Sequence, residues 1–246
     1  MNEQFIRSAM LWGEPAQERL AHSHVIVFGL GGVGSYVAEA LVRAGVGELT
    51  LVDNDTVGRT NLNRQLEALH STIGQAKTDA VAARARDIHP DVVLHPLCAT
   101  YDAAHRDVFF PAGCHYDYIV DAIDLVSCKL DLIETARRLG IPILCALGTG
   151  NKLDPARLEL TDISKTYGCP LARVMRKELR ARGIEHLPVV FSPEEPPRQL
   201  PPLPGQETPP PGRRSIPASN PWVPASAGLL LASAVVRDLI KDYPQG

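Results

Sequence analysis

A glycine-rich turn near the start of the chain most restricts the folds that it can adopt. The apolar run 24–28 ends at the segment Gly29-Leu30-Gly31-Gly32-Val33-Gly34, which leads into a stretch, 35–43, with helical spacing of its apolar residues. In a strand–turn–helix unit, glycines allow a tight turn and let the backbone approach a phosphate, whose charge the helix start favours. We therefore expect a nucleotide to bind at Gly29, Gly31, Gly32 and Gly34.

Strand and helix signals alternate along the first 150 residues. Further strands are predicted at 48–52, 92–96, 117–120 and 141–146, and further helices at 75–88 and 127–139. Elements of this length in this order indicate βαβ units. The predicted fold class is therefore α/β, with a Rossmann-like, mostly parallel sheet that carries helices on both faces.

The C-terminal third follows a different pattern and predicts a basic α+β extension. Strands are expected at 157–163 and 187–191, a basic helix at 170–182 and a closing helix at 225–240. Twelve of the 21 prolines fall within 193–224, and since each proline removes a backbone donor, we expect a loop there. We divide the chain into a nucleotide-binding domain, 1–165, and a C-terminal part, 166–246, packed on the same core.

The composition is that of an ordinary globular protein, with 45% apolar residues, 22% charged residues and a net charge of −3. These values argue against a disordered chain or a collagen-like repeat. The five cysteines form no C-x-x-C pair, which points to a reducing compartment and against a zinc ribbon. Residues 1–11 lack a signal-peptide core, and the longest apolar run, 225–236, is too short to span a bilayer. We predict a cytoplasmic protein without stable membrane insertion.

Polar residues after the second and fourth strands indicate which nucleotide the site binds and which reaction it could support. Asp53 ends the second strand, where a carboxylate can accept hydrogen bonds from ribose hydroxyls. A nicotinamide dehydrogenase would need only the glycine turn and this acid to bind its dinucleotide. In this sequence two cations, Arg64 and Lys77, follow the acid. A triphosphate attacked at its α-phosphorus needs such cations to offset developing charge. Asp124 follows the fourth strand and offers the oxygen ligand that Mg²⁺ prefers.

Five motifs, GLGGVGS, LVDNDTV, NLNRQ, GQAK and DAID, resemble those of the E1-like (ThiF-type, HesA/MoeB) adenylating superfamily in order and spacing. Members of that superfamily activate a carboxylate with ATP and Mg²⁺. The resemblance implies ATP-binding roles for Gly29, Gly31, Gly32, Gly34, Asp53, Asp55, Asn61, Arg64, Gln65 and Lys77. It implies catalytic roles for Arg7, Arg64, Lys77 and Asp124, with Asp124 as the metal ligand. It also implies a homodimer in which Arg7 reaches the partner's γ-phosphate.

Three later segments, 147–155, 162–166 and 169–180, resemble the bacterial tRNA threonylcarbamoyladenosine dehydratases, and the similarity runs from about residue 4 to residue 239. That family activates the carboxylate of a threonylcarbamoyl group on a tRNA adenosine next to the anticodon. The side chain then closes on itself with net loss of water. The implied substrates are ATP and the modified tRNA, and whether a monovalent cation assists is left open.

The net charge conceals a basic C-terminal part. Residues 1–165 carry 15 basic and 21 acidic side chains (15 − 21 = −6), whereas residues 166–246 carry 10 and 7 (10 − 7 = +3). Four cations recur at helical spacing, which places them on one helix face, and a fifth follows. The five candidate tRNA-binding residues are Arg173, Arg176, Lys177, Arg180 and Arg182. The alternative is an ordinary solvated helix face.

Other interpretations stay open from the sequence. Cys169 precedes Pro170 at a predicted helix start, where a thiol could become reactive and exchange sulfur with a transfer protein. The adenylating site could instead serve the C-terminus of a ubiquitin-like sulfur-carrier protein, although such enzymes usually carry zinc cysteines. A third alternative is a nucleotide-sensing scaffold without turnover. The eight histidines form no H-x-x-x-H pair, so none is assigned to a metal.

Overall fold

A computed structural model describes residues 2–195 and 217–243 and shows one seven-stranded sheet of order β3-β2-β1-β4-β5-β7-β6. All neighbouring strands are parallel except the edge pair β6–β7. The strands are β1 (His24–Phe28), β2 (Glu48–Val52), β3 (Val93–Leu97), β4 (Tyr118–Asp121), β5 (Ile143–Ala146), β6 (Glu159–Asp162) and β7 (Pro188–Phe191). The predicted α/β fold class is confirmed.

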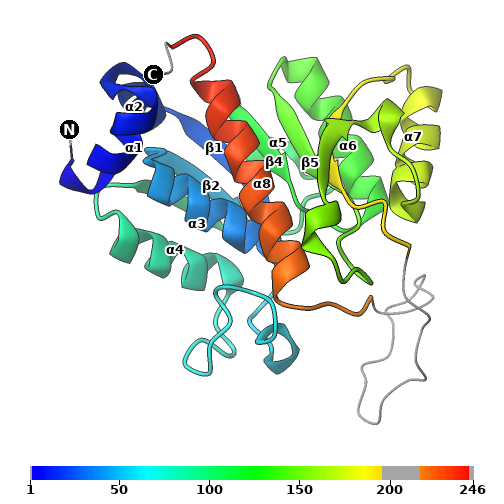
Figure 1. Cartoon of the computed structure of the whole chain (residues 1–246), viewed down its shortest axis with the longest axis horizontal. Helices are drawn as coiled ribbons and strands as arrows, with labels where there is room; N and C mark the ends of the chain where they lie inside the picture. Colours follow the sequence, from blue (N-terminus) through cyan, green and yellow to red (C-terminus); the bar gives the residue numbers. More distant parts are fainter. Residues whose placement is uncertain (1, 196–216, 244–246) are drawn as a thin grey trace.

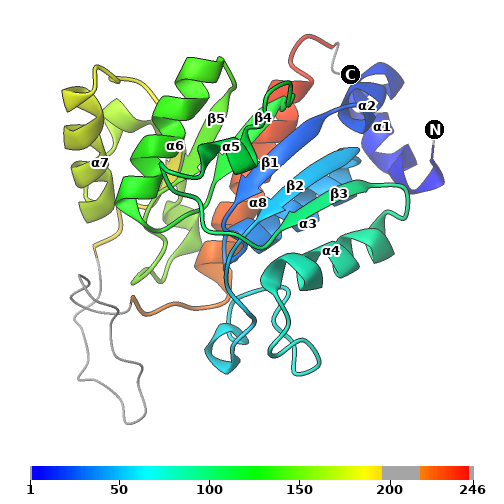
Figure 2. The ribbon, with the colours of Figure 1, turned by 180° about the vertical axis from the view of Figure 1, so that it is seen from behind.

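Helices cover both faces of the sheet. Figure 1 shows α3 and α8 in front of it, and Figure 2, turned by 180°, shows α5 and α6 in front of the opposite face. The helices are α1 (Ile6–Trp12), α2 (Glu14–Ala21), α3 (Gly34–Ala44), α4 (Lys77–Ile88), α5 (Arg106–Phe109), α6 (Val126–Leu139), α7 (Pro170–Ala181) and α8 (Trp222–Leu239). The prediction covers neither α1, α2 nor the one-turn α5.

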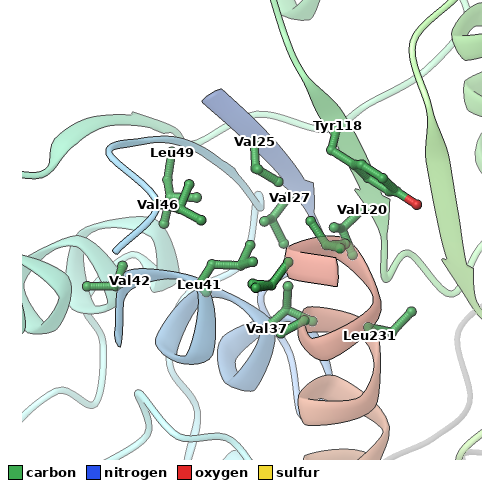
Figure 3. Packing of buried hydrophobic residues seen from close by; sticks show 14 of the residues in the cluster. Val25, Val27, Val37, Leu41, Val42, Val46, Leu49, Tyr118, Val120 and Leu231 are labelled. Atoms are coloured by element: carbon green, nitrogen blue, oxygen red, sulfur yellow. The ribbon is translucent and has the colours of Figure 1, made fainter. Parts of the chain in front are cut away.

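The main apolar core lies between the sheet and the α3–α8 layer. Figure 3 shows Val37 and Leu41 of α3 directed toward the valines of β1, and Leu231 of α8 belongs to the same buried cluster. The two helices approach closely at Gly228, where an added Cβ would lie 2.4 Å from the Val33 carbonyl oxygen. The C-terminal helix is therefore built into the core that supports the glycine turn, because α3 begins at that turn.

Helix α8 corrects the predicted end of the Pro-rich loop. It begins at Trp222, so the Pro-rich segment does not extend to residue 224 as a loop. Pro224 lies in the first helical turn, where backbone N–H groups need no helical acceptor. The helix is also 18 residues long, so by length and composition alone it could cross a membrane, which the shorter apolar run 225–236 does not indicate. Its apolar side packs against α3 and β5. The part of the predicted 193–224 loop that runs from 196 to 216 lies outside the described residues.

The C-terminal part shares the sheet with the N-terminal part. Strand β6 precedes residue 165 and β7 follows it, yet the two strands pair with each other, and β7 also pairs with β5. The division of the chain at residue 165 stays a prediction.

Candidate functional site

The glycine turn after β1 packs against the loop after β4, because these strands are neighbours. Gly29 has a φ of +86°, and a Cβ added there would lie 2.7 Å from the carbonyl oxygen of Ala122. A Cβ on Gly34 would lie 1.7 Å from the carbonyl oxygen of Gly29. Both positions therefore exclude a side chain, and these two glycines set the shape of the turn.

Gly31 and Gly32 face the segment 61–65 instead. A Cβ on Gly31 would lie 3.6 Å from Gln65 Nε2, and one on Gly32 would lie 3.4 Å from Arg64 Cγ and 3.2 Å from Pro224 Cβ of α8. The side-chain oxygen of Gln65 is buried and has no hydrogen-bond partner among the described residues. Since an unpartnered buried acceptor is costly, a ligand that donates to Gln65 beside the glycine turn would stabilise this site.

Asp53 joins the ends of β1 and β2 through its carboxylate. One oxygen accepts a hydrogen bond from the Leu30 N–H at 2.7 Å, and the other accepts from the Asp55 N–H at 2.8 Å. The Lys77 ammonium at the start of α4 lies 2.9 Å from the Asp55 carboxylate and 3.9 Å from that of Asp53. Lys77 is 5% exposed, so the two acids hold a nearly buried positive charge beside the turn.

The segment between Gly58 and Gln65 is held by its own hydrogen bonds. The Asn61 side-chain oxygen accepts from the Gly58 N–H at 2.9 Å, and its carbonyl oxygen accepts from the N–H groups of Arg64 and Gln65. The Arg64 guanidinium donates to the Thr60 carbonyl oxygen at 3.0 Å. The structure thus gives Asn61 a role in shaping the segment that presents Arg64 and Gln65 to the glycine turn.

Glu67 is a buried acid that the sequence analysis does not single out. It is 2% exposed, and burial raises the pKa of its carboxyl to about 7, while the nearby Lys77 charge opposes this rise. A substantial fraction of this carboxyl therefore holds its proton at neutral pH. Its place two residues after Gln65, in an apolar stretch, is the one sequence signal that points to it.

A buried ion pair supports the loop that carries Asp124. The Lys129 ammonium on α6 lies 2.8 Å from the Asp121 carboxylate at the end of β4, and both side chains are fully buried. Lys129 also donates to the Ile123 carbonyl oxygen, and Asp121 accepts from the Ile123 N–H, each at 3.0 Å. Asp124 follows directly and is exposed. The sequence motifs indicate Asp124 but not Lys129, which fixes the loop that carries it.

The segment before α8 closes the site from the C-terminal side. The Asn63 side chain donates to the Ser219 carbonyl oxygen at 3.1 Å, and Asn220 donates to the Lys152 carbonyl oxygen at 2.7 Å. The half-exposed Trp222 donates from its indole nitrogen to the Leu153 carbonyl oxygen at 2.7 Å. The chain from 218 to 222 therefore bridges the segment that presents Arg64 and the loop after β5 (Figure 1).

These motifs can be compared with known proteins. Residues 5–241 match the model of the ThiF family. The chain belongs to the ThiF family. The E1-like resemblance drawn from the five motifs is thereby confirmed.

Two proteins are similar to this ThiF-family chain over nearly its whole length. The tRNA threonylcarbamoyladenosine dehydratase of Bacillus subtilis (strain 168) is 41% identical over 98% of this chain and 96% of its own length. The solved structure of the E. coli tRNA N6-threonylcarbamoyladenosine dehydratase, TcdA, in complex with ATP is 33% identical, with a TM-score of 0.85. That match covers 98% of this chain and 95% of the other.

In this ThiF-family chain the five cations of the basic helix are not equivalent. Arg173, Lys177 and Arg180 of α7 are exposed. Arg176 turns back to the preceding segment and donates to the Thr166 carbonyl oxygen at 2.6 Å, so it does not share their open face. Arg182, just after α7, pairs with Glu178 at 2.9 Å. The expectation of four cations on one helix face is therefore corrected at Arg176, whereas Arg182, expected only to follow that face, is exposed but pairs with an acid.

Arg7 and Cys169 lie apart from the nucleotide-site residues. Arg7 is exposed on α1, and the neighbouring Phe5 packs on His89, just after the end of α4, whereas Lys77 begins that helix. Within one chain Arg7 is therefore far from the glycine turn. Cys169 immediately precedes α7, as predicted, but is 4% exposed, and its burial limits reagent access to the thiol.

Proposed function

We propose that this ThiF-family protein dehydrates N6-threonylcarbamoyladenosine next to the anticodon of tRNA, with ATP, by adenylating the threonyl carboxylate. The observation that carries the proposal is the extent of the similarity to the B. subtilis dehydratase, which spans 98% of this chain. It therefore includes α7 and α8 as well as the nucleotide half that other adenylating enzymes share.

The site supports the chemistry of adenylation. An anionic carboxylate is a poor electrophile, so its oxygen first attacks the α-phosphorus of ATP and pyrophosphate leaves. Lys77 and Arg64 beside the glycine turn would offset the charge that develops on the phosphates. A nucleophile of the same modified side chain then attacks the acyl carbon, and AMP leaves with the former carboxylate oxygen. Because this second step is intramolecular, it needs positioning rather than a covalent enzyme intermediate.

The proposal includes Mg²⁺ held by Asp124. An exposed carboxylate at the carboxyl end of a parallel strand, on a loop fixed by the buried ion pair, suits a hard cation bound to phosphates. The ion supplies charge neutralisation to the triphosphate when bound. We also propose a cytoplasmic homodimer, because Arg7 could act at a nucleotide only across an interface.

The decisive test uses tRNA that carries the threonylcarbamoyl group, ATP and the purified chain. After digestion to nucleosides, mass spectrometry should show the modified adenosine lighter by one water, with AMP and pyrophosphate formed in equal amounts. Unmodified tRNA is the control and should release neither. Adenylation stimulated by a sulfur-carrier protein but not by tRNA would support the alternative function instead, and unchanged ATP with both would indicate a scaffold.

We propose that the exposed cations of α7 bind the tRNA backbone. The double variant K177E/R180E should bind tRNA at least tenfold more weakly, with a salt dependence of log K reduced by roughly one per removed cation. Its affinity for ATP should be unchanged, since α7 packs on α6 and not on the glycine turn. Filter binding at several salt concentrations measures the tRNA affinity and its salt dependence. A matched control, R86E/K241E, reverses two exposed cations elsewhere, and equal weakening there would remove the assignment to α7.

A further inference from the structure

Two imidazole side chains and one carboxylate meet at the end of the sheet opposite the glycine turn. His24 begins β1 and pairs in register with Glu48, which begins β2, while His95 of β3 pairs with Thr50. Residues two apart on a strand point to the same face. His24, Glu48, Thr50 and His95 therefore share one face, although they lie far apart in the sequence.

The distances within this cluster suit the ligands of a single metal ion. His24 Nδ1 lies 3.4 Å from Glu48 Oε1, and His95 Nε2 lies 2.7 Å from the same oxygen. One ligand atom from each residue lies within 4.8 Å of the other two. Ligand atoms on a tetrahedral zinc ion are about 3.3 Å apart, given metal–ligand bonds of about 2.0–2.1 Å. Small side-chain rotations would therefore complete a three-ligand set.

The surroundings orient His24 as they do in metal sites. Its Nε2 atom lies 2.9 Å from the Thr50 hydroxyl oxygen, which leaves Nδ1 directed to Glu48. Its ring packs against that of Tyr116, with centroids 4.6 Å apart. A hydrogen bond to the second ring nitrogen is the usual way in which a ligating histidine is fixed. The His95 side chain is 47% exposed, so an ion could enter from solvent.

We propose that His24, Glu48 and His95 form a binding site for a zinc-class divalent cation. Two imidazoles and one carboxylate favour such an ion over Mg²⁺, which prefers oxygen ligands alone. The site would link β1, β2 and β3 and leave a fourth position for water. It lies about 16 Å from the glycine turn, the length of β1 at 3.2–3.4 Å per residue, so it is separate from the Asp124 site.

The test uses the full chain without an affinity tag and zinc or cobalt ions alone. Calorimetry should show one equivalent of zinc bound, and cobalt should give the visible absorption of a tetrahedral nitrogen–oxygen site. In H95Q and E48Q, zinc affinity should fall at least tenfold, with unchanged circular dichroism. The matched control is H105Q, because His105 belongs to an exposed two-residue pair with Asp102.

The outcomes separate a metal site from a hydrogen-bonded cluster. The proposal holds if the control binds like the unchanged chain and both cluster variants lose affinity. It is overturned if zinc does not bind saturably, or if H95Q and E48Q bind as tightly as H105Q. Zinc bound at this site should leave ATP affinity unchanged, so failure of this proposal says nothing against the dehydratase function.

Discussion

Asp124→Ala is expected to lower ATP-dependent AMP release by roughly a thousandfold, the scale of several kcal/mol that metal-assisted charge stabilisation supplies. The loss should be seen with every acceptor, because Asp124 would act on the triphosphate and not on the RNA. Since the side chain is exposed, the melting temperature should change little. Release of AMP and pyrophosphate, measured beside thermal unfolding, checks both parts.

A control variant separates the role of Asp124 from a general effect of lost acidity. Asp242→Ala removes another exposed carboxylate, beyond the end of α8 that is remote from the glycine turn. It should retain full activity. If Asp124→Ala keeps its activity at saturating Mg²⁺, or if the Asp242 variant loses as much, then Asp124 is not the metal ligand. A lowered melting temperature for Asp124→Ala would instead assign it to support of the loop.

Most of the sheet can be predicted because its central strands coincide with apolar runs bounded by turn residues, whereas the edge strand β6 has the half-polar sequence Glu-Leu-Thr-Asp. Helices α1 and α2 are not predicted, since α1 is short with exposed apolar residues and α2 has a polar sequence anchored by Gln17, which donates to the Ala44 carbonyl oxygen. The predicted start of α8 is wrong because a proline breaks a helix in its interior but not in its first turn, where Pro224 lies.

The nucleotide-site residues can be predicted because their motifs are local, whereas residues that act through distant contacts cannot. Lys129 has the sequence signature of a solvated helix residue, and its partner Asp121 lies on another element. Arg176 matches the spacing of a cationic helix face, but the direction of its side chain depends on a hydrogen bond to Thr166, which lies before the start of α7. The residues of the His24 cluster lie on three strands, and no local sequence pattern predicts the strand register that brings these residues together.

The second large effect is expected on stability, from the buried pair below the Asp124 loop. Lys129→Met should lower the free energy of unfolding by about 3–5 kcal/mol, because it leaves the Asp121 carboxylate buried without its counter-charge. That is a large part of the about 5–15 kcal/mol typical of a folded protein. Urea denaturation followed by circular dichroism measures the change.

The double variant D121N/K129M distinguishes an uncompensated charge from lost packing. It removes both charges, while the amide oxygen introduced at position 121 can still accept from the Ile123 N–H that Asp121 now binds. We expect it to recover most of the stability lost in Lys129→Met, since replacing both members of a buried pair is often close to neutral. If the double variant is as unstable as the single one, the Lys129 contacts to the Ile123 carbonyl and its packing dominate. Recovered stability with low adenylation activity would show that the pair also positions the loop that carries Asp124.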